Sequence, residues 1–167
     1  MLNLVVALAL AGGAPELNGP RWDGRTFRPY VDAKAAIAFD VPMSEALIES
    51  RHFDEPKRAA HVLSVIGPSG VEVELDVFND PREPGAVLDA EMSFLKSPGS
   101  STASVVVARR LPALLIVQPT TSSAYAMRTA LFTVGGRLIR VTCPLADDKR
   151  ARAIFERVLE SFAEVRR

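Results

Sequence analysis

Two histidines, His52 and His61, are the residues best suited to acid–base chemistry near neutral pH. His52 lies in the polar stretch SRHFDEP, and His61 starts a run that is typical of a strand. Because catalytic triads assemble from distant segments, either imidazole could serve a hydrolase together with Ser50, Ser64 or Asp54. For His61 the competing interpretation is an edge or surface position on a strand.

The short motifs that mark common enzyme classes are missing from the sequence. It contains no GxSxG elbow, no GxxxxGK[ST] phosphate loop, no GxGxxG, no HExxH and no CxxC. We therefore expect a protein without catalytic residues and without a cofactor. A hydrolase that uses His52 or His61 stays open as an alternative.

Three carboxylates suggest a cation site at first sight. In the run GVEVELDVF, Val71, Val73, Leu75 and Val77 alternate with Glu72, Glu74 and Asp76, as in a half-buried strand with a wet outer face. Side chains two residues apart on a strand are about 7 Å apart, too far to share one ion. We expect a solvated face, paired with an arginine of a neighbouring strand, and no metal site.

Cys143 is the only cysteine, so it cannot form an intramolecular disulfide. Its position in the sequence predicts the buried face of a hairpin, where it acts as a small hydrophobe. A nucleophilic thiol would need an exposed position and a basic neighbour.

Two surfaces are candidates for binding a partner. One is the mixed face of a hairpin, with Tyr125, Met127, Leu131 and Arg140, and the other is the pair Arg109 and Arg110. The first face could instead be covered by a helix, and the pair could be an ordinary charged strand end. With 20 basic and 20 acidic residues the chain lacks the positive excess that nucleic acid demands, so we expect a protein partner.

A hairpin in the carboxyl-terminal third positions these candidates. Gly135 and Gly136 suit the two-residue turn of a type I′ or II′ hairpin. With Val134 opposite Arg137, one face is apolar, and the other pairs Leu131 with Arg140 and Thr129 with Thr142. The apolar face comprises Phe132, Val134, Ile139, Val141 and Cys143.

A long helix is predicted after the hairpin, with Asp147 or Asp148 as its amino-terminal cap. Its apolar stripe should cover the apolar hairpin face, and Arg152 and Glu156 are spaced for an ion pair. The stripe consists of Ala151, Ile154, Phe155, Val158, Leu159, Phe162 and Val165.

The rest of the chain predicts further strands and one middle helix. TFRPYVDAKAAIAFDVP suggests one or two short strands, and AAHVLSVIG and GVEVELDVF form a second hairpin around Pro68 and Ser69. AVLDAEMSFLK is the helix, the Ser-rich residues 97–104 are a loop, and VVVARRL and ALLIVQP add strands. The fold class is α+β, an antiparallel sheet packed by helices with a long carboxyl-terminal helix.

The strand IAFDVP and the ending TVGGRLIRVTCPLADDKRARAIFERVLESF, which closes in Glu160, Ser161 and Phe162, resemble the PsbP-like fold. This fold is shared by an oxygen-evolving-complex subunit and a Ran-binding nuclear import factor. The resemblance covers about residues 25–165, although Met43 follows Pro42 where the family commonly has an aromatic residue. It implies an α/β/α sandwich and a non-catalytic accessory or binding subunit of a larger assembly. A secretion or envelope assembly chaperone is a second alternative, which an apolar groove beside the sheet would indicate.

The amino terminus has an apolar stretch, LNLVVALALAGGA, of the length of a signal-peptide core and too short to span a bilayer. No Lys or Arg precedes Arg21, so the usual positive start is missing. We expect a signal peptide at 1–13, a flexible segment at 14–25, one domain at 26–167, and a periplasmic or secreted protein. A buried first strand or helix of a cytoplasmic domain is the alternative.

We predict that the protein isolated from its cells begins at Ala14, because Ala11 and Gly13 satisfy the small-residue rule for cleavage. Amino-terminal sequencing of the purified protein measures this. An intact Met1 would contradict export and favour the cytoplasmic alternative.

Overall fold

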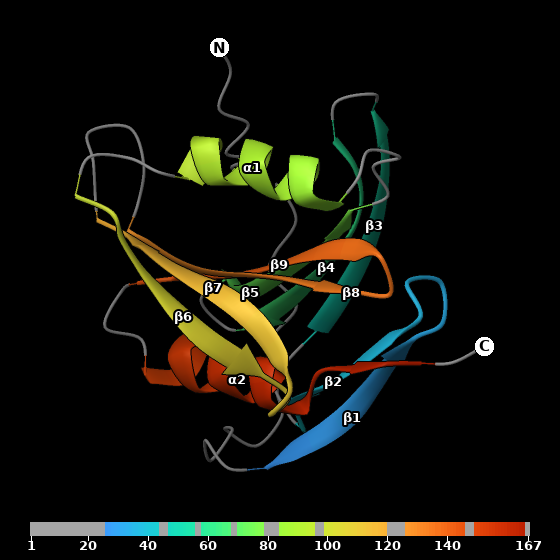
Figure 1. Cartoon of the computed structure of the whole chain (residues 1–167). Helices are drawn as coiled ribbons and strands as arrows, with labels where there is room; N and C mark the ends of the chain where they lie inside the picture. Colours follow the sequence, from blue (N-terminus) through green and yellow to red (C-terminus); the bar gives the residue numbers. More distant parts are fainter. Residues whose placement is uncertain are drawn as a thin grey trace, which may run out of the picture.

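The computed structural model describes residues 26–43, 47–55, 58–67, 70–78, 84–95, 99–119, 126–145 and 149–165. The strands within these ranges are β1 Phe27–Asp32, β2 Ile37–Pro42, β3 Leu47–Glu55, β4 Arg58–Gly67, β5 Gly70–Phe78, β6 Ser101–Val107, β7 Leu111–Gln118, β8 Met127–Val134, β9 Arg137–Pro144 and β10 Ala163–Glu164. The helices are α1 Pro84–Leu95 and α2 Lys149–Ser161 (Figure 1). The predicted segments 1–13 and 14–25, Pro68, Ser69, Asp147 and Asp148 lie outside the described residues.

Three layers build the molecule (Figure 1). The middle layer is a seven-stranded antiparallel sheet in the order β3-β4-β5-β9-β8-β7-β6. Helix α1 covers one face, and the other face is covered by α2 together with a small sheet in the order β1-β2-β10. The predicted antiparallel sheet with two helices, one of them at the carboxyl-terminal end, is confirmed. The small sheet was not predicted as a separate unit, since its strands could equally have extended the large one.

The β8–β9 hairpin has the predicted register. Val134 lies opposite Arg137, and Phe132 lies opposite Ile139. Gly135 and Gly136 have φ angles of 55° and 72°, the left-handed region that a type I′ turn requires. A side chain at Gly135 would also overlap the carboxylate of Glu164.

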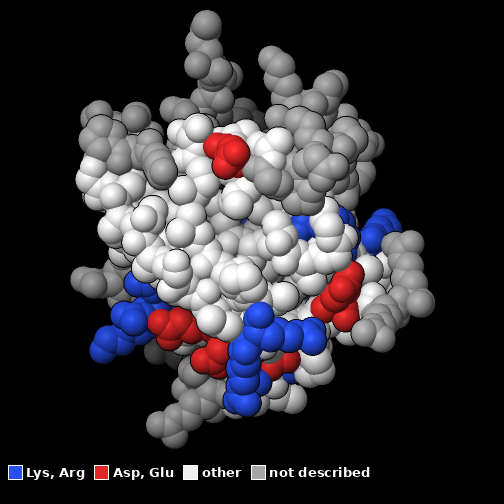
Figure 2. All heavy atoms as spheres, in the orientation of Figure 1, with Lys and Arg blue, Asp and Glu red and all other residues white. Residues whose placement is uncertain are grey.

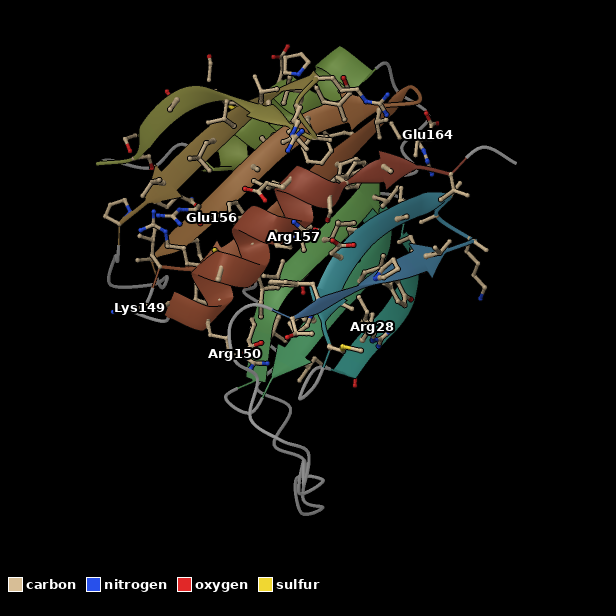
Figure 3. All side chains as sticks on the ribbon, turned by 90° about the horizontal axis from the view of Figure 1, so that it is seen from below. Arg28, Lys149, Arg150, Glu156, Arg157 and Glu164 are labelled. Carbon is tan, nitrogen blue, oxygen red and sulfur yellow. The ribbon has the colours of Figure 1, made fainter. Side chains whose placement is uncertain are left out.

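The apolar stripe of α2 packs on this hairpin. Ile154, Phe155 and Val158 are buried there, and the rings of Phe132 and Phe162 meet edge to face with centroids 4.9 Å apart. Figure 3 shows the helix lying on the large sheet, beside the strands β1 and β2. Helix α2 therefore covers the apolar face of the hairpin, as predicted. The predicted ion pair between Arg152 and Glu156 forms at 2.8 Å.

The end of α2 differs from the prediction, which continued the apolar stripe to Val165. The helix ends at Ser161, whose hydroxyl accepts the Asp40 N–H at 2.8 Å and donates to the Arg157 carbonyl at 2.7 Å. Ala163 and Glu164 then pair with β2 as the short strand β10. The hydrogen bond between Ser161 and β2 lies where the helix ends. The spacing of apolar residues in the sequence does not reveal such a contact.

The outer face of β5 is not wet, contrary to the prediction. A bulge places Val73 opposite Val65 but Val71 opposite Ile66, so Glu72 is the extra residue. Val71 is consequently 49% exposed, whereas Glu72 is 3% exposed and its carboxylate pairs with Arg150 of α2 at 2.5 Å.

Asp76, on the same strand, is fully buried and pairs with Arg140 of β9 at 2.5 Å. The guanidinium of Arg140 also lies over the Phe78 ring, 5.3 Å from its centroid. The predicted arginine from a neighbouring strand is thus present, but the pair lies under α1 and away from water. Arg140 therefore offsets the cost of burying the Asp76 carboxylate.

We predict that Phe162→Ala lowers the free energy of unfolding by about 3–5 kcal/mol, because a buried ring and its contact with Phe132 are lost. Urea unfolding followed by circular dichroism measures this. Glu160→Ala, on the exposed side of α2, is the control and should change the value by no more than about 0.5 kcal/mol. Equal effects of both substitutions would contradict the packing described here.

Candidate functional site

His61 forms a buried pair with Asp32, with 3.0 Å between its Nε2 and the Asp32 Oδ2. His61 lies on β4 and Asp32 ends β1, so the pair joins the two sheets. His61 is 5% exposed, and Ser64, three residues further along the strand, lies on the opposite face of β4. His52 lies opposite His61 in the β3–β4 ladder, and its side chain is outside the described part of the chain.

The carboxylate of Asp32 is stabilised in its charged form. Burial opposes ionisation, but the Ala35 N–H donates to Asp32 Oδ1 at 2.8 Å and His61 contacts the other oxygen. The hydrogen bonds outweigh burial and hold the pKa of Asp32 below its usual value of 3.8. The pair therefore links the two sheets. Because His61 is buried in this contact, its ring is not accessible to a substrate.

Among the described residues, no group of three His, Cys, Asp or Glu side chains is arranged to hold a metal ion. Cys143 is buried on the apolar hairpin face, as its position in the sequence predicted. Burial is the main reason that its pKa rises to about 11. A thiol so rarely ionised near neutral pH is a poor nucleophile.

The mixed hairpin face lies beneath α1. Leu131 is 1% exposed and packs in a cluster with Leu88 and Met92 of that helix. Arg140 is buried in its pair with Asp76, Met127 is half-buried, and Tyr125 lies outside the described residues. Helix α1 thus covers Leu131. A covering helix was the alternative that the sequence left open for this face.

Arg109 and Arg110, the second candidate, are exposed at the turn between β6 and β7. Within the described part of the chain neither guanidinium makes an ion pair. Ala108 and Arg109 have φ angles of 51° and 60°, a left-handed conformation that is costly for residues with a Cβ. The Arg110 N–H donates to the Val107 carbonyl at 3.1 Å, and the Ala108 N–H donates to the Leu159 carbonyl of α2 at 2.8 Å.

Only the second half of the strand before this turn was predicted from the sequence, because VVVARRL was predicted to be a strand but residues 97–104 were predicted to be a loop. β6 begins at Ser101 and forms one edge of the large sheet. Its first four residues are exposed, and Val106 is 65% exposed. Figure 2 shows the face around β6 and β7 as a nearly uncharged area, with charged side chains gathered along the lower rim near α2.

No protein-family model and no curated protein matches the chain. Among solved structures, it is similar to cyanobacterial PsbP (CyanoP) from Synechocystis sp. PCC 6803, with a TM-score of 0.51 and 14% sequence identity. The match covers 91% of this chain and 98% of that chain. The chain has the PsbP-like fold. At this identity the likeness establishes the fold alone.

The residues that suggested the PsbP-like fold are structural. Ser161 fastens α2 to β2, and Phe162 fills the core beside Phe132. No helix in the described part of the chain is both long and apolar enough for a membrane span.

We predict that Asp32→Asn lowers the free energy of unfolding by about 1–3 kcal/mol at neutral pH, because a buried charged hydrogen bond is weakened. The folded-state pKa is depressed, so this stability is present above 3.8 and is lost as the pH falls through the folded-state pKa. Urea unfolding of both proteins across pH should therefore show their difference closing in acid. A difference that is constant across pH would contradict the role given to the charge.

Proposed function

We propose that the protein is a non-catalytic binding protein, an accessory subunit of a larger assembly, and that it contacts a protein partner through Arg109 and Arg110. The observation that carries the proposal is their turn: Arg109 and Arg110 are exposed and make no ion pair within the described residues, and the backbone at Ala108 and Arg109 is strained.

A comparison with the β8–β9 hairpin shows that the backbone strain at Ala108 and Arg109 is unusual. There the β8–β9 turn uses Gly135 and Gly136 for its left-handed conformations, whereas the β6–β7 turn uses Ala108 and Arg109. A left-handed conformation costs a residue with a Cβ about 1–2 kcal/mol, which glycine avoids. Strain of this kind is concentrated at functional positions. What the strained turn provides is a fixed backbone position for two arginines at the rim of the sheet.

The alternatives have less support. The large apolar side chains that are exposed in the described residues are Val31, Met43, Val71 and Val106, which lie on four different segments and do not favour a chaperone groove. A hydrolase that uses His61 would need this side chain to meet a substrate, and it is buried against Asp32; the side chain of His52 lies outside the described part of the chain. The resemblance to PsbP-like accessory subunits agrees with the binding role.

The proposal includes export to the periplasm or the medium, with the cytoplasm as the alternative. It rests on the apolar stretch at residues 1–13.

We predict that the double variant Arg109→Ala and Arg110→Ala no longer retains the partner, because both charge and geometry of the contact are lost. Affinity capture from the native cells, with mass spectrometry of the retained proteins, measures this. The matched control removes two exposed cations of α2, Lys149→Ala with Arg152→Ala, and should retain the partner. Recovery of the same proteins by all three forms would contradict the proposed contact.

A further inference from the structure

The edges of the two sheets are protected in different ways. β3, at one edge of the large sheet, has the sequence LIESRHFDE, which includes the charged residues Glu49, Arg51, Asp54 and Glu55, and β1, at the edge of the small sheet, includes Arg28 and Pro29. Charges and proline at an edge prevent pairing with another chain. β6, with the sequence STASVVV, has neither a charge nor a proline. Among the long edge strands in the described residues, β6 alone lacks this protection.

The free backbone groups of β6 can be identified from its register. Val106 lies opposite Pro112, which has no N–H, so these residues cannot exchange two hydrogen bonds. In an antiparallel ladder, hydrogen-bonded and non-bonded pairs alternate, and the bonded residues are therefore 101, 103, 105 and 107. Thr102, Ser104 and Val106 direct their N–H and C=O groups toward the open edge.

The charge distribution indicates what can approach this edge. Residues 92–146 contain no Asp or Glu, but they contain six cations: Lys96, Arg109, Arg110, Arg128, Arg137 and Arg140. Arg137 and Arg140 are engaged inside the molecule with the Ala35 carbonyl and with Asp76. Arg109 and Arg110, next to the carboxyl end of β6, are exposed. A second copy of this chain that paired antiparallel along β6 would place its uncharged Ser101 end beside Arg109 and Arg110, whereas an acidic segment complements them.

We infer that β6 accepts an extended segment of the partner protein as an additional antiparallel strand, with acidic residues just before the paired run. This inference rests on the proposed function, because it specifies the partner's chemistry. In antiparallel pairing the amino-terminal end of the segment lies beside Val107, which places the acidic residues next to Arg109 and Arg110. The backbone groups of the three edge residues supply affinity, and Val106 selects an apolar residue opposite it.

The probe for the test is a fluorescein-labelled octapeptide, Asp-Glu-Thr-Val-Thr-Val-Thr-Val, whose anisotropy reports binding to the full chain. Saturable binding is expected. The peptide with its two acidic residues moved to the carboxyl end should bind several-fold more weakly, and N-methylation at alternate residues should abolish binding. Equal binding of all three peptides, or no binding of any, would overturn the inference.

Two variants of the protein test the edge itself. Ser104→Pro removes an outward N–H without removing a bond to β7, and Ser104→Lys adds the kind of charge that protects β3. Each should weaken peptide binding at least about tenfold, the equivalent of one lost hydrogen bond. Ser104→Lys keeps the test valid if the proline variant fails to fold. The control is Thr133→Lys, an exposed position on β8, which should bind as the wild type does. A loss of binding in this control as large as in the Ser104 variants would overturn the inference.

The outcome also separates this inference from the proposed function. If the peptide does not bind but capture of the partner still depends on Arg109 and Arg110, strand addition is wrong and the binding role stands. If neither peptide binding nor capture of the partner depends on Arg109 and Arg110, both strand addition and the proposed contact are wrong. Sedimentation adds a further check: a wild-type dimer that Ser104→Lys converts to a monomer would show that the occupant is a second copy, which overturns the inference.

Discussion

The rest of the structure depends on the contacts made by the last turn of α2 and by Phe162, which directly follows it. Phe162 packs its ring against Phe132 of the large sheet, and Ser161 accepts the Asp40 N–H of the small sheet. The Leu159 carbonyl, one of those that a helix end leaves without an intrahelical donor, accepts the Ala108 N–H of the β6–β7 turn. One helical turn thus contacts both sheets and holds the backbone of the β6–β7 turn that carries the exposed arginines. The position of the candidate surface follows from the packing of the core.

Polar pairs complete this framework by joining separate elements. Asp32 contacts His61 between the sheets, and two ion pairs join Asp76 to Arg140 under α1 and Glu72 of β5 to Arg150 of α2. Taking the charges of the two ion pairs out of water is costly, and removing one partner leaves the other uncompensated. Their value therefore lies in specifying one arrangement of the layers. The exposed Arg109 and Arg110 contrast with them, since within the described residues they make no ion pair.

Much of the fold could be predicted because it depends on local patterns. The two glycines at 135 and 136 set the hairpin register, and the helical stripe identified the face of α2 that packs on it. The bulge at Glu72 could not be predicted, since the sequence alternates through it and only the Arg150 of a distant helix explains it. Serine and threonine at 101–104 resembled a loop, although the absence of acidic residues from 92 to 146 was a signal of an unusual surface. The burial of Leu131 depends on α1, which no pattern in the hairpin itself reveals.

Hydrogen exchange of the free protein, followed amide by amide with NMR, tests this account most directly. The Ala108 N–H donates to the Leu159 carbonyl, so we expect it to exchange only through global unfolding. The amides of Thr102, Ser104 and Val106 should exchange rapidly, and that of Val105, which lies in the ladder with β7, should be protected. Fast exchange at Ala108, or uniform protection along β6, would contradict the account.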